Sequence, residues 1–354
     1  MMDPLFKVIT FGRVGTVAIN SFLDQHPEIS APWNEEVYKE YATKVGKLSN
    51  LPFLKNEKIK ANGLVIHHQE FLRDKMNYQL NQLAEYPANK IIHLVRHPAD
   101  QVLSWINHCN ASAIIGSGGW KYIKPTARSL FKEKKAVVEA LKSGQIANYF
   151  YQKDSKIKLV DFDSLKSNKI SSTMKDIYQF LNVDESFSSE SFFQRQNNIA
   201  EELLLQGISF NLNGEVIEVG FRLLSRIKNI FENDPRSHGK FEPWVTLNEP
   251  DFIVNHCPDL PPVNGKICVI PKNITKYNQL KNETKKILHE NLTSIIPEIM
   301  GEWAKRANEF GKKIKKAKID KLSDEDREYV MTMLADDLKI FTNYYPEYTS
   351  KWAV

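Results

Sequence analysis

Residues 5–16 read LFKVITFGRVGT, and their pattern indicates the fold class. Its first six residues are apolar apart from one lysine and one threonine, as in a short buried strand, and a turn with two glycines follows. Apolar residues then recur at helical spacing from Val17 to Leu23. A strand, a glycine-bearing turn and a helix in this order are typical of sheets whose strands alternate with helices.

Three further apolar stretches end at polar residues in the same way. They span residues 64–66, 90–95 and 157–160. A helical pattern follows the second of them, and another, residues 170–181, follows the third. This alternation predicts an α/β fold with a parallel sheet flanked by helices, whose ligands bind beyond the carboxyl ends of the strands.

The second half of the chain is less regular. Residues 205–310 contain clusters of Gly, Asn and Pro, so we expect a largely helical or irregular insertion with one helix at about 288–310. Ser323 and Asp326 form a capping pair for a last helix that reaches Ile340. We therefore expect one overall domain. Its predicted parts are a core at 1–204, the insertion at 205–310, which shapes the acceptor site, and a C-terminal segment at 311–354 that completes the core.

The composition excludes several classes of protein. A chain of 354 residues with 42% hydrophobic and 26% charged residues is an ordinary globular protein. The net charge of +5 is too small for a dedicated nucleic-acid binder. The three cysteines contain no closely spaced pair, which argues against a disulfide framework. No apolar run approaches about 18 residues and no leader pattern is visible, so we expect a cytoplasmic protein without a membrane partner.

The turn at residues 12–16 has the features of a phosphate site. It directs backbone N–H groups towards a ligand at the start of a helix, and Arg13 and Thr16 add a positive charge and a hydroxyl donor. None of the Gly-Lys pairs in the chain is followed by Ser or Thr, so the turn is not a Walker A loop. This disfavours a kinase or GTPase.

A second motif, IIHLVRHPADQVLS at residues 91–104, joins a strand to a helix. Arg96 follows the strand directly, and Pro98 suits the first turn of the helix. Ser104 falls in the second helical turn, so a guanidinium and a hydroxyl group can meet one phosphate. The plainer alternative is an arginine at the sheet edge and a serine on a solvated helix face.

The two motifs together resemble those of sulfotransferases that use 3′-phosphoadenosine 5′-phosphosulfate (PAPS). The resemblance covers about residues 5–182 and 310–354, including DQHPEI at 24–29. It implies a P-loop-NTPase-like core, PAPS as donor, adenosine 3′,5′-bisphosphate as product and no required metal. It assigns Arg96 and Ser104 to the 3′-phosphate. The residues that it assigns to the 5′-phosphosulfate share the first turn; they are Gly12, Arg13, Val14, Gly15, Thr16 and Val17.

The chain departs from the family pattern at a few positions. Arg13 stands where many members have lysine, and Val14 and Val17 stand where serine and threonine are usual. Backbone donors must therefore do more, and an arginine is a poorer proton donor to a leaving oxygen than a lysine. Phe162 stands where a tyrosine often touches the nucleotide.

Two histidines are candidates for the catalytic base. His67 and His68 follow the second predicted strand, and adjacent strand residues face opposite sides. The resemblance favours His67, and a neutral imidazole can take the proton of the acceptor. Glu35 and Glu36 lie where some bacterial relatives have a carboxylate base. The choice among these residues stays open.

A basic loop in the family contacts the 3′-phosphate, and two stretches compete for this role. Gly311, Lys312 and Lys313 occupy the corresponding place before the last helix, and residues 236–240 are the rival. The basic run at 312–318 also fits a solvated helix face.

The resulting prediction is a sulfotransferase that transfers a sulfuryl group from PAPS to a hydroxyl or amine of a small-molecule acceptor. A natural product such as an alkaloid is suggested by the resemblance alone. Residues 205–310 and 33–41 are expected to meet the acceptor. The alternatives are a small-molecule kinase or other nucleotide-dependent transferase, and a catalytically silent nucleotide-binding protein. No nucleic-acid partner is expected, and a homodimer is left open.

Overall fold

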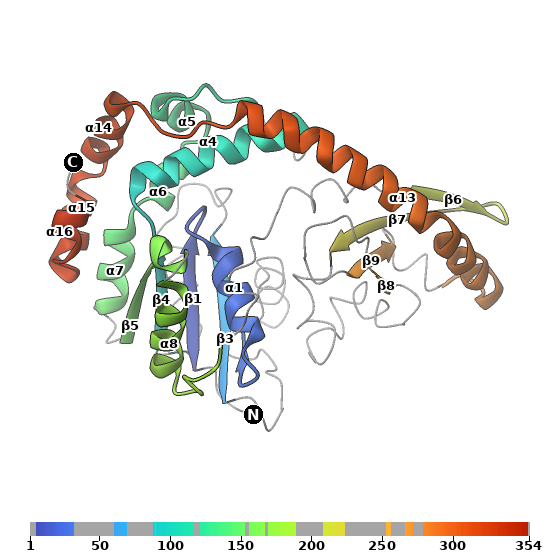
Figure 1. The fold of residues 1–354 in the computed structure, drawn as a ribbon, viewed down its shortest axis with the longest axis horizontal. Helices are drawn as coiled ribbons and strands as arrows, with labels where there is room; N and C mark the ends of the chain where they lie inside the picture. Colours follow the sequence, from blue (N-terminus) through green and yellow to red (C-terminus); the bar gives the residue numbers. More distant parts are fainter. Residues whose placement is uncertain are drawn as a thin grey trace. The chain divides into compact units, whose positions relative to one another are not determined.

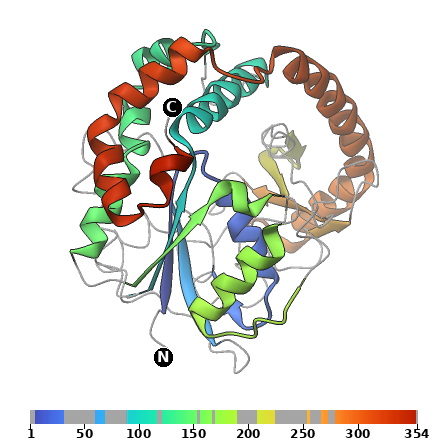
Figure 2. The same ribbon diagram turned by 60° about the vertical axis from the view of Figure 1, so that its left-hand side comes forward.

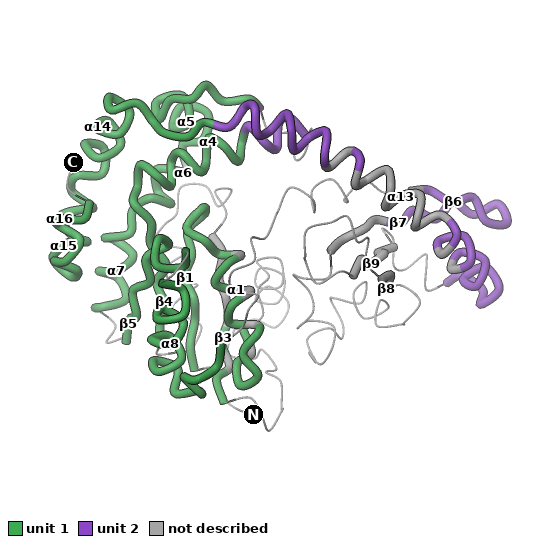
Figure 3. Tube along the Cα trace, in the orientation of Figure 1, with its two compact units in different colours: residues 1–109, 122–193, 319–354 green, residues 110–121, 194–318 purple. Residues whose placement is uncertain are grey.

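The computed structural model forms two compact units, which Figure 3 distinguishes by colour. The first contains residues 1–109, 122–193 and 319–354, and the second contains residues 110–121 and 194–318. The structure describes residues 5–31, 60–68, 88, 90–115, 121–152, 156–166, 169–188, 208–223, 253–255, 266–271 and 279–352.

The first unit is built on a parallel five-stranded sheet, as the sequence predicts (Figure 1). The strands, in spatial order, are β2 (Ile29–Ser30), β3 (Ala61–His68), β1 (Phe6–Phe11), β4 (Lys90–Val95) and β5 (Lys156–Asp161). The chain places β3 on one side of β1 and then crosses to β4 on the other side. Ligands of such sheets bind at this reversal, outside the carboxyl ends of the strands.

The strand register brings the predicted motifs to one edge of the sheet. His67 and His68 at the end of β3 pair with Thr10 and Phe11 of β1. The last residue of β4 pairs with Asp161, the last residue of β5. Because all the strands are parallel, the turn after β1, the residues after β4 and those after β5 emerge at the same edge.

One face of the sheet carries the main apolar core. The helices α1 (Thr16–Gln25) and α8 (Ile170–Leu181) cover this face, as Figures 1 and 2 show. The α8 helix packs through apolar residues at helical spacing, which include Met174, Ile177 and Leu181. Phe6 and Val8 of β1 and Ile92 and Leu94 of β4 meet them from the sheet. The alternation of side chains along a strand accounts for this division between faces.

The DQHPEI stretch connects the end of α1 to the segment after α8. His26 Nδ1 accepts a hydrogen bond from the backbone N–H of Glu28, and His26 Nε2 lies 2.9 Å from the carbonyl oxygen of Asp184. The Glu28 carboxylate in turn accepts from the backbone N–H of Asp184. The stretch that resembles the family motif therefore has a structural role at this end of the sheet.

The opposite face of the sheet is covered by α7 and by the C-terminal helices. Val95 of β4 packs in an apolar cluster with Ala147, Phe341, Tyr345 and Trp352. The helices connected along this part of the chain are α4 (Pro98–Ile115), α5 (Ala127–Glu133), α6 (Ala136–Ala140), α7 (Ser143–Tyr151), α14 (Asp324–Met333), α15 (Ala335–Tyr344) and α16 (Tyr348–Lys351).

The predicted cap of the last helix is confirmed, but the single helix is not. Ser323 Oγ accepts from the backbone N–H of Asp326 at 3.1 Å. The helix is interrupted at Leu334, so α14 and α15 replace the one helix that was predicted to reach Ile340. The interruption lets Asp337 cap α7, since its carboxylate accepts from the backbone N–H groups of Gly144 and Gln145 at 2.8 Å each.

The second unit contains more regular structure than the sequence indicates. An antiparallel sheet has the order β6 (Ile208–Leu212), β7 (Glu215–Leu223), β9 (Lys266–Pro271) and β8 (Ile253–Asn255). The helix expected at 288–310 exists, but α13 spans Asn282–Ala317. Within the described residues, no helix combines the length and the apolar composition needed to cross a bilayer.

Candidate functional site

The turn between β1 and α1 has an unusual backbone. Gly12, Arg13 and Gly15 have φ angles of 28°, 66° and 102°. Gly15 is the N-cap of α1, and because glycine has no side chain it supplies no capping group to the first N–H groups of the helix. These N–H groups and the helix dipole favour an anion at this position.

The turn is held by close contacts from two neighbouring elements. A Cβ atom on Gly12 would lie 2.2 Å from Trp105 Cζ2, and one on Gly15 would lie 2.4 Å from Phe162 Cδ2. Trp105 belongs to α4, and Phe162 begins the short 3-10 helix η2 (Phe162–Leu165) after β5. Buried Gln101 donates from Nε2 to the carbonyl oxygens of Phe11 and Gly12 at 2.7 Å each. The conformation of the turn is therefore imposed by α4 and η2.

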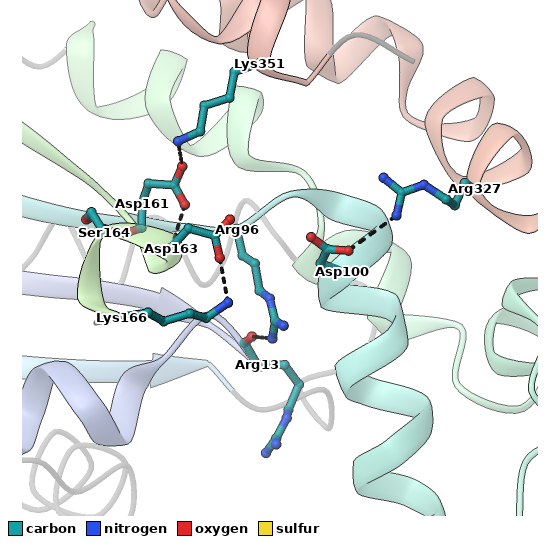
Figure 4. Close-up of polar contacts among 9 residues, drawn as sticks. All are labelled: Arg13, Arg96, Asp100, Asp161, Asp163, Ser164, Lys166, Arg327 and Lys351. Carbon is teal, nitrogen blue, oxygen red and sulfur yellow. Dashed lines mark hydrogen bonds and ion pairs between the residues drawn. The ribbon is translucent and has the colours of Figure 1, made fainter. Parts of the chain in front are cut away.

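The structure brings the two predicted phosphate motifs together. Arg13 Nε donates to Ser104 Oγ at 3.3 Å, and Arg96 Nη1 donates to the carbonyl oxygen of Arg13 at 3.1 Å. Figure 4 shows the Arg96 guanidinium beside the backbone of Arg13, whereas the Arg13 side chain extends away from it. The carboxyl edge of the sheet thus carries the two guanidinium groups separately, with Arg13 bonded to Ser104 and Arg96 bonded to the backbone of the turn.

Arg96 lies in an environment that needs a negative charge. Its guanidinium lies 4.6 Å from the centroid of the Phe162 ring, and its Nε is buried with no hydrogen-bond partner among the described residues. Burial lowers the pKa of Arg96, an effect that Asp100, Asp163 and Asp161 oppose. An arginine remains protonated at neutral pH, so this half-buried charge and its unpaired Nε donor favour an anionic ligand.

The acidic residues near Arg96 are paired with other cations. Asp163 pairs with Lys166 at 2.6 Å, and Asp100 pairs with Arg327 at 3.5 Å. Asp161 pairs with Lys351 (Figure 4). Burial acts to raise the pKa of Asp163, but Lys166, with help from Arg96 and Lys351, lowers it on balance. Among the described residues, no carboxylate forms an ion pair with Arg96 itself.

The remaining residues of the first turn are placed differently from one another. Val14 is 2% exposed and packs in the core below the sheet edge, so its side chain does not face a ligand. Thr16 is buried at the start of α1. The backbone of Val17 belongs to α1, but its side chain lies outside the described residues. The substitution of valine for a hydroxyl residue at position 14 is thus explained by packing.

The proposed bases are only partly described. His67 and His68 are the last residues of β3, opposite Thr10 and Phe11, so their backbone lies beside the first turn. Their side chains lie outside the described residues, as do Glu35 and Glu36. Residues 33–41, expected to meet the acceptor, also lie outside.

The structure places residues 311–313 in a helix, the alternative to a basic loop. Gly311, Lys312 and Lys313 lie within α13 and belong to the second unit. Lys312 and Lys313 are exposed there, as in a solvated helix face. The surrounding lysines favour a helix, which tolerates one glycine at a cost of about 1 kcal/mol. Contact of these residues with a 3′-phosphate stays untested, and the rival residues 236–240 lie outside the described residues.

Three site residues were missed in the sequence. Gln101 and Trp105 hold the turn, and Lys351 pairs with Asp161. Gln101, Ser104 and Trp105 are spaced i, i+3 and i+4 along α4, so they share one helix face. This spacing is the sequence signal that identifies Gln101 and Trp105.

One further buried group lies on β4, below the edge. His93 is 2% exposed, and neither ring nitrogen has a hydrogen-bond partner among the described residues. Burial lowers the pKa of His93 to about 3, so its imidazole is neutral. Over the described part of the chain, no three His, Cys, Asp or Glu side chains gather as a metal-binding group.

Comparison with known families identifies the class of the protein. The model of the sulfotransferase domain family matches residues 3–203, more than half of the chain. The chain therefore belongs to this family, and it is a transferase of the sulfotransferase type. The family resemblance of the two motifs and the predicted α/β fold are confirmed.

Solved structures with the same domain are similar at low identity. A sulfotransferase from Alicyclobacillus acidocaldarius is 16% identical, with 58% of this chain and 91% of that chain covered and a TM-score of 0.39. The sulfotransferase domain from the curacin biosynthetic pathway is 16% identical, with 56% and 80% covered and a TM-score of 0.36. That from the Synechococcus PCC 7002 olefin synthase is 13% identical, with 56% and 80% covered and a TM-score of 0.33. A comparison with curated proteins finds no match.

Proposed function

We propose that the protein transfers a sulfuryl group from PAPS to a hydroxyl or amine of a small-molecule acceptor. The observation that carries this proposal is the half-buried Arg96, whose buried Nε has no partner among the described residues and whose Nη1 contacts the first turn. Ser104 is joined to the same turn through Arg13. A half-buried cation with an unpaired Nε donor beside an anion-binding helix start suits a ligand with more than one anionic group.

The residues present fit the two ends of such a donor. Arg96 and Ser104 would hold the 3′-phosphate, as their positions in the family motif imply. The backbone N–H groups of Gly15 and Thr16 and the charge of Arg13 would hold the 5′-phosphosulfate. Phe162, which packs on both Gly15 and Arg96, fixes the spacing between these two parts of the site through apolar and cation–π contacts.

PAPS supplies a sulfuryl group whose bond to the 5′-phosphate oxygen breaks as the acceptor oxygen or nitrogen bonds to sulfur. The acceptor proton passes to a base, for which His67 or His68 is proposed, with Glu35 as the carboxylate alternative. The position of the two histidines at the end of β3, beside the first turn, supports their proposed role as the base. Arg13 stabilises the negative charge on the departing phosphate, and as an arginine it acts by charge and hydrogen bonding. The other product is adenosine 3′,5′-bisphosphate.

The finer details rest on the family resemblance. We propose a small molecule as acceptor, met by residues 33–41 and 205–310, and a reaction that requires no metal. Three cysteines in 354 residues are consistent with a reducing cytoplasm. The oligomeric state remains to be measured, and a homodimer is one of the states to be tested.

Thermal unfolding with different nucleotides tests the donor. We expect adenosine 3′,5′-bisphosphate and PAPS to raise the midpoint, whereas ATP with Mg²⁺ leaves it unchanged. A ligand at about 100 times its Kd stabilises the folded state by about 2.7 kcal/mol. A shift with ATP and Mg²⁺ alone would overturn the proposal in favour of a kinase. Binding of PAPS without sulfuryl transfer to any member of an acceptor panel would identify a silent nucleotide-binding protein.

A further inference from the structure

The charge around Arg96 is balanced by residues from distant parts of the chain. Three carboxylates act on its guanidinium, those of Asp100, Asp161 and Asp163. Uncompensated, they would attract Arg96 and would repel a phosphate that approaches it. Each carboxylate is instead paired with another cation, so Arg96 keeps a donor unpaired.

Two of these three cations come from the last 36 residues of the chain. Lys351 of α16 pairs with Asp161, and Arg327 of α14 pairs with Asp100. Lys351 also acts on Asp163, whose pKa it helps to lower. Lys166, four residues beyond Phe162, is the third cation. Figure 4 shows the two C-terminal cations reaching the carboxylates from elements other than those that carry Arg96 and Arg13.

Residues 319–352 of the C-terminal segment are anchored firmly enough to hold these cations in place. The Asn107 side chain forms two hydrogen bonds of 2.9 Å with the backbone of Ile319. Asp326 accepts from the backbone N–H of Ala127 at the start of α5. Trp352, next to Lys351, stacks on Phe341 with 4.6 Å between the ring centroids. The position of Lys351 is thus fixed by burial of its neighbour.

We propose that Lys351 and Arg327 are positioning residues for the anion site, which keep Arg96 available to the nucleotide 3′-phosphate by pairing the carboxylates of Asp161 and Asp100. This inference rests on the proposed function, because it takes the 3′-phosphate as the ligand of Arg96. The net charge of this group is +1, because four cations, Arg96, Lys166, Lys351 and Arg327, face the three carboxylates. Without Lys351 the same set is neutral.

The test is the affinity ratio between adenosine 3′,5′-bisphosphate and AMP, measured by isothermal titration calorimetry on the full chain. We expect Lys351→Met to lower this ratio about tenfold. AMP lacks the 3′-phosphate, so the loss of the Lys351 charge weakens binding of the bisphosphate more than binding of AMP. Lys351→Arg should keep the ratio of the wild type. The double variant Lys351→Met with Asp161→Asn should restore it, because the carboxylate and its partner are removed together.

Arg128→Met is the matched control. Arg128 forms an exposed ion pair of 2.7 Å with Glu325, also in the C-terminal segment, but it pairs with none of the three carboxylates. We expect its ratio to equal that of the wild type. The Arg128–Glu325 pair is exposed and contributes at most about 1 kcal/mol. Asp161 is buried, so Lys351→Met leaves a buried carboxylate unpaired and costs more stability, and unfolding curves will verify that every variant is folded at the titration temperature.

The outcomes separate the inference from the proposed function. An unchanged ratio in Lys351→Met, an equal fall in Arg128→Met, or no recovery in the double variant overturns the inference while the proposed donor stands. A wild type that binds the two nucleotides equally overturns the proposed function, and the inference with it.

Discussion

Two turns of the molecule have similar backbone angles and different surroundings. The turn between β1 and α1 contains Arg13 at φ 66° and Gly15 at φ 102°, and the turn between β6 and β7 contains Asn213 at φ 54° and Gly214 at φ 83°. A Cβ atom on Gly15 would lie 2.4 Å from Phe162, whereas one on Gly214 would meet nothing within 4 Å.

The difference shows what a glycine with positive φ indicates about a site. In the β6–β7 hairpin, Leu212 pairs with Glu215 across a two-residue Asn-Gly turn, which needs positive φ only to reverse the chain. In the first turn, the glycine is also needed for close approach of Phe162, which carries the Arg96 guanidinium on its ring. Close approach, in addition to backbone angle, marks the functional turn.

The largest effect is expected for Gly15→Ala. The substitution places a Cβ atom in the left-handed region and against the Phe162 ring, so we expect a loss of about 3 kcal/mol or more in the free energy of unfolding. Denaturant unfolding measures this loss. In the double variant with Phe162→Ala, the Gly15→Ala change should cost less than in the wild type. An equal cost in both backgrounds would remove close approach from the explanation.

The free energy of unfolding should depend on pH through His93, which lies on β4 of the parallel sheet. The unfolded His93 imidazole binds a proton below its ordinary pKa of 6.5, but the folded one, with a pKa of about 3, does not. The unfolded state therefore binds more protons as the pH falls, and stability decreases from about pH 6.5 downwards. Between pH 8 and pH 5 this amounts to about 2 kcal/mol.

Denaturant unfolding of His93→Leu at the same two pH values isolates this contribution. We expect the variant to lose less stability than the wild type over this range. Equal losses in the two proteins would show that His93 does not remain neutral in the folded state.

A smaller effect is expected for Gln101→Leu, which removes the donor that holds the first turn. The carbonyl oxygens of Phe11 and Gly12 lose this partner, and we expect a loss of about 1–2 kcal/mol in unfolding free energy. Binding of adenosine 3′,5′-bisphosphate should weaken as well, since the turn is less rigidly placed. A variant with wild-type affinity would show that η2 alone is sufficient to position the turn.

The smallest effect is expected for Gly214→Ala. The added methyl group meets open space, so only the positive φ opposes it, at about 1 kcal/mol. Nucleotide affinity should remain that of the wild type. A larger loss of stability here than in Gly15→Ala would reverse the comparison of the two turns.

The sequence predicted the local features well. Residues 5–16 and 91–104 contain a strand, a turn or cap, and the start of a helix in contiguous order, so their structure follows from spacing alone. The hairpin at 208–219 was missed, although apolar and polar residues alternate from Ile208 to Leu212 and an Asn-Gly pair follows. Clusters of Gly, Asn and Pro further along residues 205–310 favour an irregular insertion over the whole range.

Long-range pairing could not be predicted from the sequence. Asp161 and Lys351 are 190 positions apart, and nothing in the local sequence of either residue specifies the other. The same holds for Asp337 and the start of α7. Charged and capping side chains acquire distant partners only through tertiary packing. The pairing of the carboxylates near Arg96 with C-terminal cations therefore could not be predicted from the sequence.

The most direct measurement is calorimetric titration of the wild type and of Arg96→Met with adenosine 3′,5′-bisphosphate and with AMP. A charge-assisted contact from the half-buried Arg96 to the 3′-phosphate should give the wild type a preference on the order of 100-fold for the bisphosphate. Arg96→Met should lose most of this preference, while its affinity for AMP falls much less because Gln101 still holds the turn. Equal affinities in the wild type, or an undiminished preference in Arg96→Met, would contradict the assignment of this site.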